Sequence, residues 1–152
     1  MLQVGDQVPD LDLPNYDGQR ISLASLRGRP VVLYFFPKAG TYGCTIETKG
    51  FVEGYDELER RGATVIGVSV DGAEKQGAFA RECQVRFPLI ADRDGTVTRA
   101  FGVRGFLGLA RRVTFLIDAD GRIAEVVEGM RPGPHVEAAL RRLPPAAGDR
   151  PA

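Results

Sequence analysis

The chain has 152 residues, of which 43% are hydrophobic and 26% charged. This length and composition are typical of one globular domain whose core is large enough to fold without a disulfide or a metal. Lys and Arg number 20, as do Asp and Glu, so the net charge is zero. That balance argues against nucleic acid as the main partner, because phosphate binding needs a surplus of positive charge.

The sequence also argues against a membrane protein. Its apolar stretches are far shorter than the roughly 18 residues of a spanning helix. The opening residues, Met1 to Asp6, show neither the basic nor the apolar region of a signal peptide, so a cytoplasmic location is the default expectation.

The first predicted element is a hairpin in the turn-rich N-terminal segment, with Asp17-Gly18 as its tip. The β-branched and aromatic run over 31–36 is typical of a strand buried on both faces. Apolar residues at i, i+4 and i+7 predict a helix over about 44–61, and a second buried strand follows at 63–70.

A second helix is expected over 73–85. Asp71 and Glu74 resemble a capping box at its start. Phe79 and Cys83 lie four positions apart, so both face the same way.

Shorter elements follow along the chain. We expect a strand or turn at 87–90 and a short helix at 96–101. Strands at 113–117 and 122–127 are separated by a turn and predict a hairpin. The last helix is predicted over 136–143.

The order of these elements favours the α/β class, with a central mixed sheet and helices on both of its faces. The domain is expected to span 1–143, followed by a flexible tail at 144–152 that is rich in Pro and Ala.

The chain holds two cysteines, Cys44 and Cys83, and one histidine, His135. Without a carboxylate these three side chains cannot complete the four ligands of a structural zinc site, so no metal is expected. A structural disulfide is not expected without a secretion signal, which leaves thiols that are either buried and inert or reactive. His135 stands at the start of the last helix, and we expect it on the surface.

The segment around Cys44 has the pattern of a reactive thiol. A buried strand ends at Pro37, a loop with two glycines follows, and Cys44 falls in or just before the first turn of the next helix. The free N–H groups and the positive dipole end of a helix start favour a thiolate there. The Thr41 hydroxyl can cap the helix or donate to a ligand beside the sulfur. The residues alone leave open that Cys44 is a small buried hydrophobic side chain.

Several motifs at suitable spacing carry a family resemblance. They are Pro37-Lys38-Ala39-Gly40-Thr41-Tyr42-Gly43-Cys44-Thr45, preceded by Val4-Gly5-Asp6 and Pro9-Asp10 and followed by Phe87-Pro88-Leu89-Ile90-Ala91-Asp92 and Arg112-Val113-Thr114-Phe115-Leu116-Ile117-Asp118. The first resembles the P-x-x-x-T-x-x-C signature of peroxiredoxins. The others resemble the bacterioferritin comigratory protein, or peroxiredoxin Q, subgroup. The resemblance covers about residues 3–143.

The resemblance implies a thioredoxin-like fold and a thiol peroxidase that needs no metal or organic cofactor. Cys44 would be the peroxidatic cysteine, and Thr41 would orient the peroxide. Arg112 would hold the peroxide and stabilise the thiolate, Pro37 would shield it from water, and Glu47 would orient the arginine. These roles agree with their chemistry, since an arginine fork aimed at the O–O bond stabilises the developing charge.

Arg111 and Arg112 are adjacent at a strand start, where successive side chains point to opposite faces. One of them is therefore expected to point inward and the other into solvent. The resemblance selects Arg112 as the inward one.

The chain departs from the family at two positions. Tyr42 stands where proline is more common, and Lys49 stands where many members carry a resolving cysteine. The candidate resolving thiol is then Cys83, which would condense with an oxidised Cys44 to a disulfide. Two helices need not bring the Cα atoms within the roughly 7 Å that a disulfide requires, so we expect local unwinding around 41–50 or 73–85.

Alternatives remain open from the sequence. Cys83 can instead pack beside Phe79 while an external thiol resolves the sulfenic acid, and a non-catalytic redox sensor would share the first chemical step. A disulfide oxidoreductase would need a C-x-x-C pair, but Glu47 occupies that position. The apolar loop 106–109 can line a hydroperoxide pocket or contact a reductant or subunit, although packing onto the core is preferred.

The resemblance also implies the partners: a peroxide substrate, a thioredoxin- or glutaredoxin-like reductant, and a monomeric or weakly dimeric state.

Overall fold

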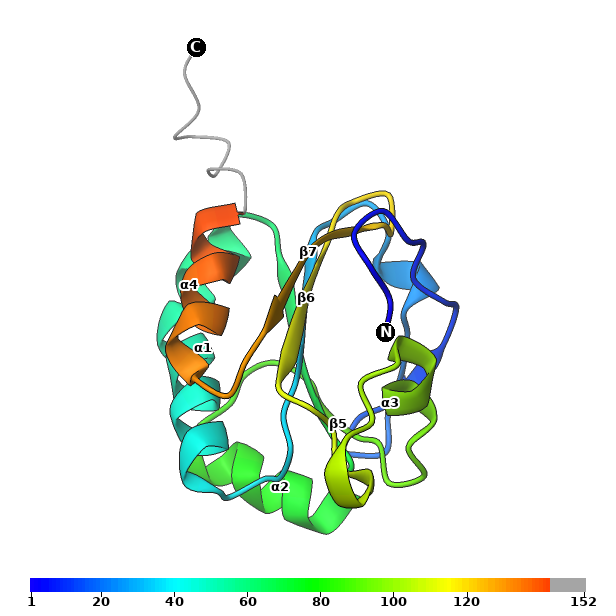
Figure 1. Ribbon diagram of the computed structural model, residues 1–152. Helices are drawn as coiled ribbons and strands as arrows, with labels where there is room; N and C mark the ends of the chain where they lie inside the picture. Colours follow the sequence, from blue (N-terminus) through cyan, green and yellow to red (C-terminus); the bar gives the residue numbers. More distant parts are fainter. Residues whose placement is uncertain (143–152) are drawn as a thin grey trace.

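The computed structural model describes residues 1–142. Its centre is a five-stranded sheet in the order β5-β4-β3-β6-β7 (Figure 1). The first three run parallel to one another, and the last two are antiparallel to their neighbours. The strands are β3 (Val31–Phe35), β4 (Thr64–Ser69), β5 (Leu89–Ala91), β6 (Val113–Ile117) and β7 (Ile123–Glu128).

Helices cover both faces of this sheet, as predicted (Figure 1). One face carries α1 (Tyr42–Arg60), α2 (Ala73–Glu82) and α4 (Pro132–Arg142). The other carries α3 (Thr96–Phe101) together with the hairpin of β1 (Asp12–Pro14) and β2 (Arg20–Ser22). The short 3-10 helices η1 (Ala24–Leu26) and η2 (Phe106–Gly108) complete the described elements.

The central strand divides the core in two. Along β3, Val31, Leu33 and Phe35 pack on the side of α3, and the intervening Val32 and Tyr34 pack on the side of α1. All five side chains are buried, which accounts for the continuous apolar run. The helix-side layer is aromatic, with Tyr34, Phe36, Phe51, Phe79 and Phe87 in mutual ring contacts.

Small residues let α4 approach α1 closely. A Cβ at Gly50 would lie 3.0 Å from a methyl of Val136, and one at Gly54 would lie 3.8 Å from the methyls of Leu140. These contacts place α4 against the middle of α1, and the approach is tightest at Gly50, because a Cβ at Gly54 would be at ordinary contact distance.

The predicted hairpin at Asp17-Gly18 is confirmed by the pairing of β1 with β2. The other elements fall within a few residues of their predicted ranges, and the last helix begins earlier, at Pro132. Its predicted end at Leu143 and the predicted tail at 144–152 lie outside the described residues.

The capping box predicted at Asp71 and Glu74 is wrong. Gly72 is the N-cap of α2, and no side chain caps it. The Asp71 carboxylate instead accepts hydrogen bonds from the Ala39 N–H and the Ser69 hydroxyl, both at 2.7 Å. A tertiary contact has therefore taken the side chain that the local pattern assigned to the helix.

Within residues 1–142, no helix has the length and apolar character that a membrane span requires.

Gly67, in the middle of β4, provides a test of this packing. A Cβ there would lie 2.6 Å from a Leu89 methyl and 2.7 Å from Cζ of Tyr34, so the ring of Tyr34 occupies its place. We expect Gly67→Ala to lower the free energy of unfolding by about 1–3 kcal/mol through overpacking. Urea denaturation measures it, with Gly54→Ala as a control that is expected to be neutral or slightly stabilising. Equal stability of the two variants would contradict this account.

Candidate active site

Cys44 lies in the first turn of α1, as predicted. The backbone leaves β3 at Phe35, turns at Gly40, where φ is +82°, and begins the helix after Thr41. The first helical bond runs from the Thr45 N–H to the Thr41 carbonyl at 2.9 Å. The thiol is 1% exposed, at the wall of the aromatic layer.

Arg112 contacts this thiol from the start of β6. Its Nη2 lies 3.4 Å from Cys44 Sγ, and its Nη1 donates to Glu47 Oε1 at 2.6 Å. Arg111 points to the other face and pairs at the surface with Glu128 at 2.7 Å. The structure thus brings Cys44, Glu47 and Arg112 together, with the inward and outward arginines in the predicted arrangement.

The Glu47–Arg112 pair is almost completely removed from water, with side chains 0% and 4% exposed. Burial lowers the pKa of Arg112, but the charges of Glu47 and Cys44 outweigh it and raise the pKa overall. Burial raises the pKa of Glu47 from 4.5 to about 7, against the opposing effect of Arg112. Because the folded state holds this proton more tightly than the unfolded chain, the carboxyl destabilises the fold as pH rises from about 4.5 to about 7.

Thr41 does not cap the helix as the sequence suggested. It occupies the N-cap position, but its hydroxyl donates to the Lys38 carbonyl at 2.7 Å. The proton of the hydroxyl is thereby occupied within the loop, and the oxygen retains lone pairs that can accept a hydrogen bond.

Two cavities open beside the loop that carries Thr41. One, of about 420 Å³, is bounded by Pro37 and Arg112 and by the apolar side chains of Phe106, Leu109 and Met130. The preferred prediction that the loop 106–109 packs onto the core is wrong, because Phe106 is 83% exposed.

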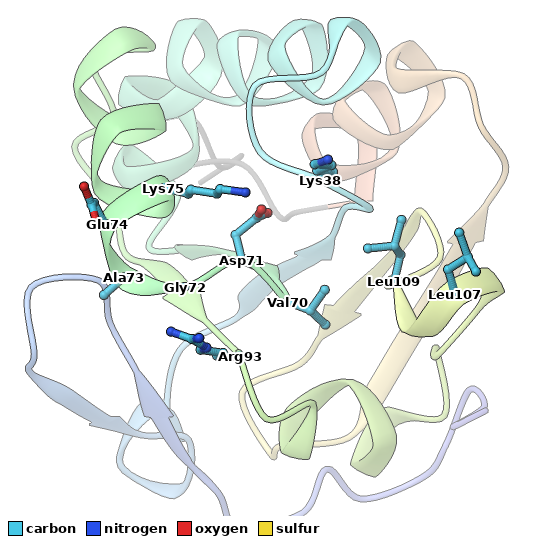
Figure 2. A pocket seen from close by; sticks show the side chains of 10 residues that line it. All are labelled: Lys38, Val70, Asp71, Gly72, Ala73, Glu74, Lys75, Arg93, Leu107 and Leu109. Carbon is cyan, nitrogen blue, oxygen red and sulfur yellow. The ribbon is translucent and has the colours of Figure 1, made fainter.

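The other cavity, of about 580 Å³, lies over the start of α2 (Figure 2). Figure 2 shows Lys38 and Lys75 directed toward the space above Asp71, with Arg93 below and Leu109 on the opposite side. The Asp71 carboxylate accepts a hydrogen bond from the Ala39 N–H, so the segment directly before α2 is bonded to the loop that precedes Cys44.

Cys83 lies at the other end of α2, where it is the C-cap residue. It is 4% exposed and packs in the same core cluster as Cys44, and the two thiols are not bonded to each other. Burial, followed by the charge of Glu82, raises the pKa of the Cys83 thiol.

The prediction that His135 lies on the surface is wrong, since the side chain is fully buried. Its Nδ1 is 2.8 Å from the Thr114 hydroxyl and 3.8 Å from Glu47 Oε2, and its Nε2 is 2.8 Å from the Gly129 carbonyl. Helix α4 is oriented so that His135, near its N-terminus, faces α1. This orientation follows from the packing of α4 on α1, which the local sequence pattern does not reveal.

Gly43 is a second residue whose part in the site the sequence did not indicate. A Cβ at this position would lie 2.9 Å from Arg112 Nη2, so the guanidinium occupies the space of the missing side chain. The position of Gly43 directly before the candidate nucleophile was the sequence feature that could have indicated its role.

Within residues 1–142, no three His, Cys, Asp or Glu side chains gather in a way that could hold a metal ion.

The Gly43–Arg112 contact leads to a test that separates geometry from stability. We expect Gly43→Ala to push Arg112 Nη2 away from Cys44 and to slow alkylation of Cys44 by iodoacetamide at pH 7 by roughly 10-fold. Stability in urea should not fall, because alanine favours a helix more than glycine does. Gly54→Ala, in the same helix, is the control for the added methyl. An unchanged alkylation rate in Gly43→Ala would show that Arg112 does not depend on this space.

Comparison with known proteins agrees with this geometry. Residues 4–126 match the model of the AhpC/TSA family. The chain is 38% identical over 149 residues to peroxiredoxin Bcp of Escherichia coli, which covers 93% of this chain and 96% of that protein. It is similar to the crystal structure of peroxidoxin BcpB from Mycobacterium tuberculosis, with a TM-score of 0.86 and 37% identity over 93% of this chain and 96% of that one.

A bacterioferritin comigratory protein of Xanthomonas campestris, studied for its alkyl peroxide reduction activity, matches with a TM-score of 0.83 and 29% identity over 93% of this chain and 94% of that one. These relatives span nearly the whole chain and share its thioredoxin-like sheet. The chain therefore belongs to the AhpC/TSA family, among the peroxiredoxins of the Bcp type.

Proposed function

We propose that Cys44 is the peroxidatic residue of this thiol-dependent peroxidase and that it reduces hydrogen peroxide and organic hydroperoxides. Membership of the family makes the chain an oxidoreductase that acts on peroxides and is recycled by thiol reductants. The observation that supports Cys44 as the nucleophile is the Arg112 Nη2 donor 3.4 Å from its sulfur, at the start of a helix.

The proposed first step is a displacement on oxygen. The Cys44 thiolate attacks the terminal oxygen of ROOH, an S–O bond forms, and the O–O bond breaks. The products are a sulfenic acid on Cys44 and RO⁻, which takes a proton to leave as water or an alcohol. Charge moves from sulfur to the leaving oxygen, so a fixed cationic donor that spans both positions lowers the barrier.

Four side chains complete the proposed site. Arg112 reaches the sulfur while Glu47 holds the other end of its guanidinium. Thr41, whose hydroxyl proton is bonded to the Lys38 carbonyl, has its oxygen free to accept the O–H of the peroxide. Pro37 lines the same cavity as Arg112 and excludes water from the thiolate with an apolar surface.

The apolar cavity of about 420 Å³ supports organic hydroperoxides as substrates. Phe106, Leu109 and Met130 form walls against which an alkyl chain would be buried, and the cavity ends at Arg112. The alkyl peroxide reduction described for the Xanthomonas campestris relative is consistent with this proposal.

Cys83 is the proposed resolving residue. Its thiol would attack the sulfenic acid of Cys44, forming the S–S bond and releasing water. In the reduced fold it is buried with a raised pKa, so it must first be exposed to act as a thiolate. Unwinding near the end of α2 is supported by Gln84, the next residue, whose φ of +56° lies in the left-handed region that favours glycine.

The recycling partner is proposed to be a thioredoxin- or glutaredoxin-like protein, which would reduce the disulfide by thiol exchange. A one-cysteine peroxidase resolved by an external thiol is the alternative mechanism, and a non-catalytic redox sensor is the alternative function. The monomeric or weakly dimeric state and the cytoplasmic location stay predictions.

Replacing the nucleophile tests the central assignment. We expect Cys44→Ser to reduce hydrogen peroxide consumption to the uncatalysed rate in an assay with a thioredoxin system, because a serine hydroxyl is not ionised at neutral pH. Circular dichroism should show the wild-type fold. Many turnovers per wild-type molecule would support the enzyme, whereas one stoichiometric oxidation would support the sensor. Residual multiple turnover in Cys44→Ser would overturn the assignment.

A separate variant tests the resolving role. Cys83→Ser should form the Cys44 sulfenic acid as fast as the wild type, yet lose turnover that is supported by thioredoxin. Intact-mass spectrometry after peroxide treatment without reductant should show a Cys44–Cys83 bridge in the wild type and an oxidised, unbridged Cys44 in the variant. Turnover of Cys83→Ser at the wild-type rate would mean that an external thiol resolves the intermediate.

A further inference from the structure

A buried acceptor without a donor lies behind the peroxide site. Glu47 uses Oε1 to bind Arg112, but among the described residues no donor lies within hydrogen-bonding distance of Glu47 Oε2. Both carboxylate oxygens are out of contact with water. A buried polar atom that lacks a partner destabilises the fold, and does so more when it is charged. An oxygen in this state is expected to bind a proton or to gain a hydrogen-bond donor.

The group facing this oxygen is the imidazole of His135, whose Nδ1 is 3.8 Å from Glu47 Oε2. The Gly129 carbonyl can only accept, so the nitrogen bonded to it, Nε2, carries the ring proton. In the neutral ring Nδ1 is then an acceptor, and the Thr114 hydroxyl donates to it at 2.8 Å. Oε2 thus lies 3.8 Å from Nδ1 without a donor of its own, and one added proton can reside on either group: on Oε2, or on Nδ1, which then donates to the Thr114 oxygen.

We propose that Glu47 and His135 share one proton, and that His135 thereby acts as a positioning residue that sets Arg112 over the Cys44 sulfur. With the proton absent, Glu47 carries its full charge and holds Arg112 Nη1 firmly. With the proton on Oε2, Glu47 is neutral, Oε1 becomes a weaker acceptor, and the guanidinium is held less tightly. With the proton on Nδ1, the imidazolium donates to the Thr114 oxygen, and its charge, 3.8 Å from Oε2, weakens the hold of Glu47 on Arg112 in the same direction. The proposal deepens the function proposed above and rests on it.

The surroundings favour proton sharing at neutral pH. Burial raises the pKa of Glu47 to about 7 and lowers the pKa of His135 from its ordinary value of 6.5, so the carboxyl competes with the imidazole for a proton near neutral pH. Besides Glu47, the buried titratable and charged groups on the packed elements are Cys44 on α1, Tyr34 on β3 and Arg112 directly before β6. The neighbouring strand β7 carries Glu125 and Glu128. The two β7 carboxylates pair with arginines at the surface.

Packing also fixes the positions of Glu47, His135 and Arg112 relative to one another. Arg112 directly precedes β6 and lies two positions before Thr114, so both side chains point to the same face of the sheet. Gly50 lets α4 approach α1, which keeps His135 against Glu47. A change at His135 would thus reach Arg112 through Glu47.

The single histidine of the chain makes a direct test possible, on protein without a histidine tag. We expect the ¹⁵N imidazole spectrum of the reduced protein to show the Nε2–H form at high pH. The Nδ1 shift should then change with a midpoint near pH 7, and Glu47→Gln should move that midpoint or abolish the change. This measurement needs no peroxide turnover, so its outcome is independent of the proposed function. An Nδ1 shift that is flat between pH 5 and 9 in the wild type would overturn the shared proton.

Kinetics test the positioning role. His135→Gln can donate to the Gly129 carbonyl but cannot share the proton, so we expect kcat/KM for hydrogen peroxide to fall roughly 10-fold. In the wild type, the fall of kcat/KM toward acid pH should follow the same midpoint as the imidazole signal. In His135→Gln this part of the pH dependence should be absent. Leu140→Ala is the control, because it removes a contact with Gly54 at the far end of α4 and leaves the Gly50–Val136 contact that holds His135 in place, so it should keep the wild-type pH profile. A His135→Gln variant with the wild-type rate and pH profile, or a Leu140→Ala variant with the same altered profile, would contradict the proposal.

Discussion

The ion pair between Glu47 and Arg112 is the contact on which the rest of the site depends. It joins α1 to β6 across 65 positions of sequence, with 2.6 Å between Oε1 and Nη1. Either charge alone inside the protein would cost several kcal/mol, so each requires the other. The pairing fixes one edge of the guanidinium and leaves Nη2 directed at the Cys44 sulfur. A contact that balances buried charge therefore also aims the donor that we propose to be catalytic.

Missing side chains shape this site as much as the polar groups do. Gly43 leaves the space that Arg112 Nη2 occupies, and Gly50 allows α4 to lie close on α1. Without that close approach His135 would not reach Glu47. The glycines belong to regular helices, so they are explained by contacts between elements and not by turns.

The two thiols are buried in the reduced fold, but a disulfide between them would require a local opening. Both are buried in one aromatic layer, which keeps the reduced protein well packed and holds Cys83 away from solvent. A resolving reaction needs that layer to open locally. The end of α2 is the part suited to open, because Cys83 is its C-cap and the next residue, Gln84, has a left-handed backbone. In this proposal the sheet keeps the site residues in position, and the end of α2 is the part that moves.

The sequence by itself determined the sheet class, the hairpin, the buried strands and the place of Cys44 at a helix start, because each of these depends on residues close together in the chain. Strand alternation limited the arginine to one of two adjacent residues, and family resemblance chose Arg112. Only the tertiary structure decided that Asp71 and Thr41 bind the loop instead of capping helices and that His135 is buried beside Glu47. Those outcomes depend on how helices and strands distant in sequence approach one another, and local periodicity carries no information about that approach.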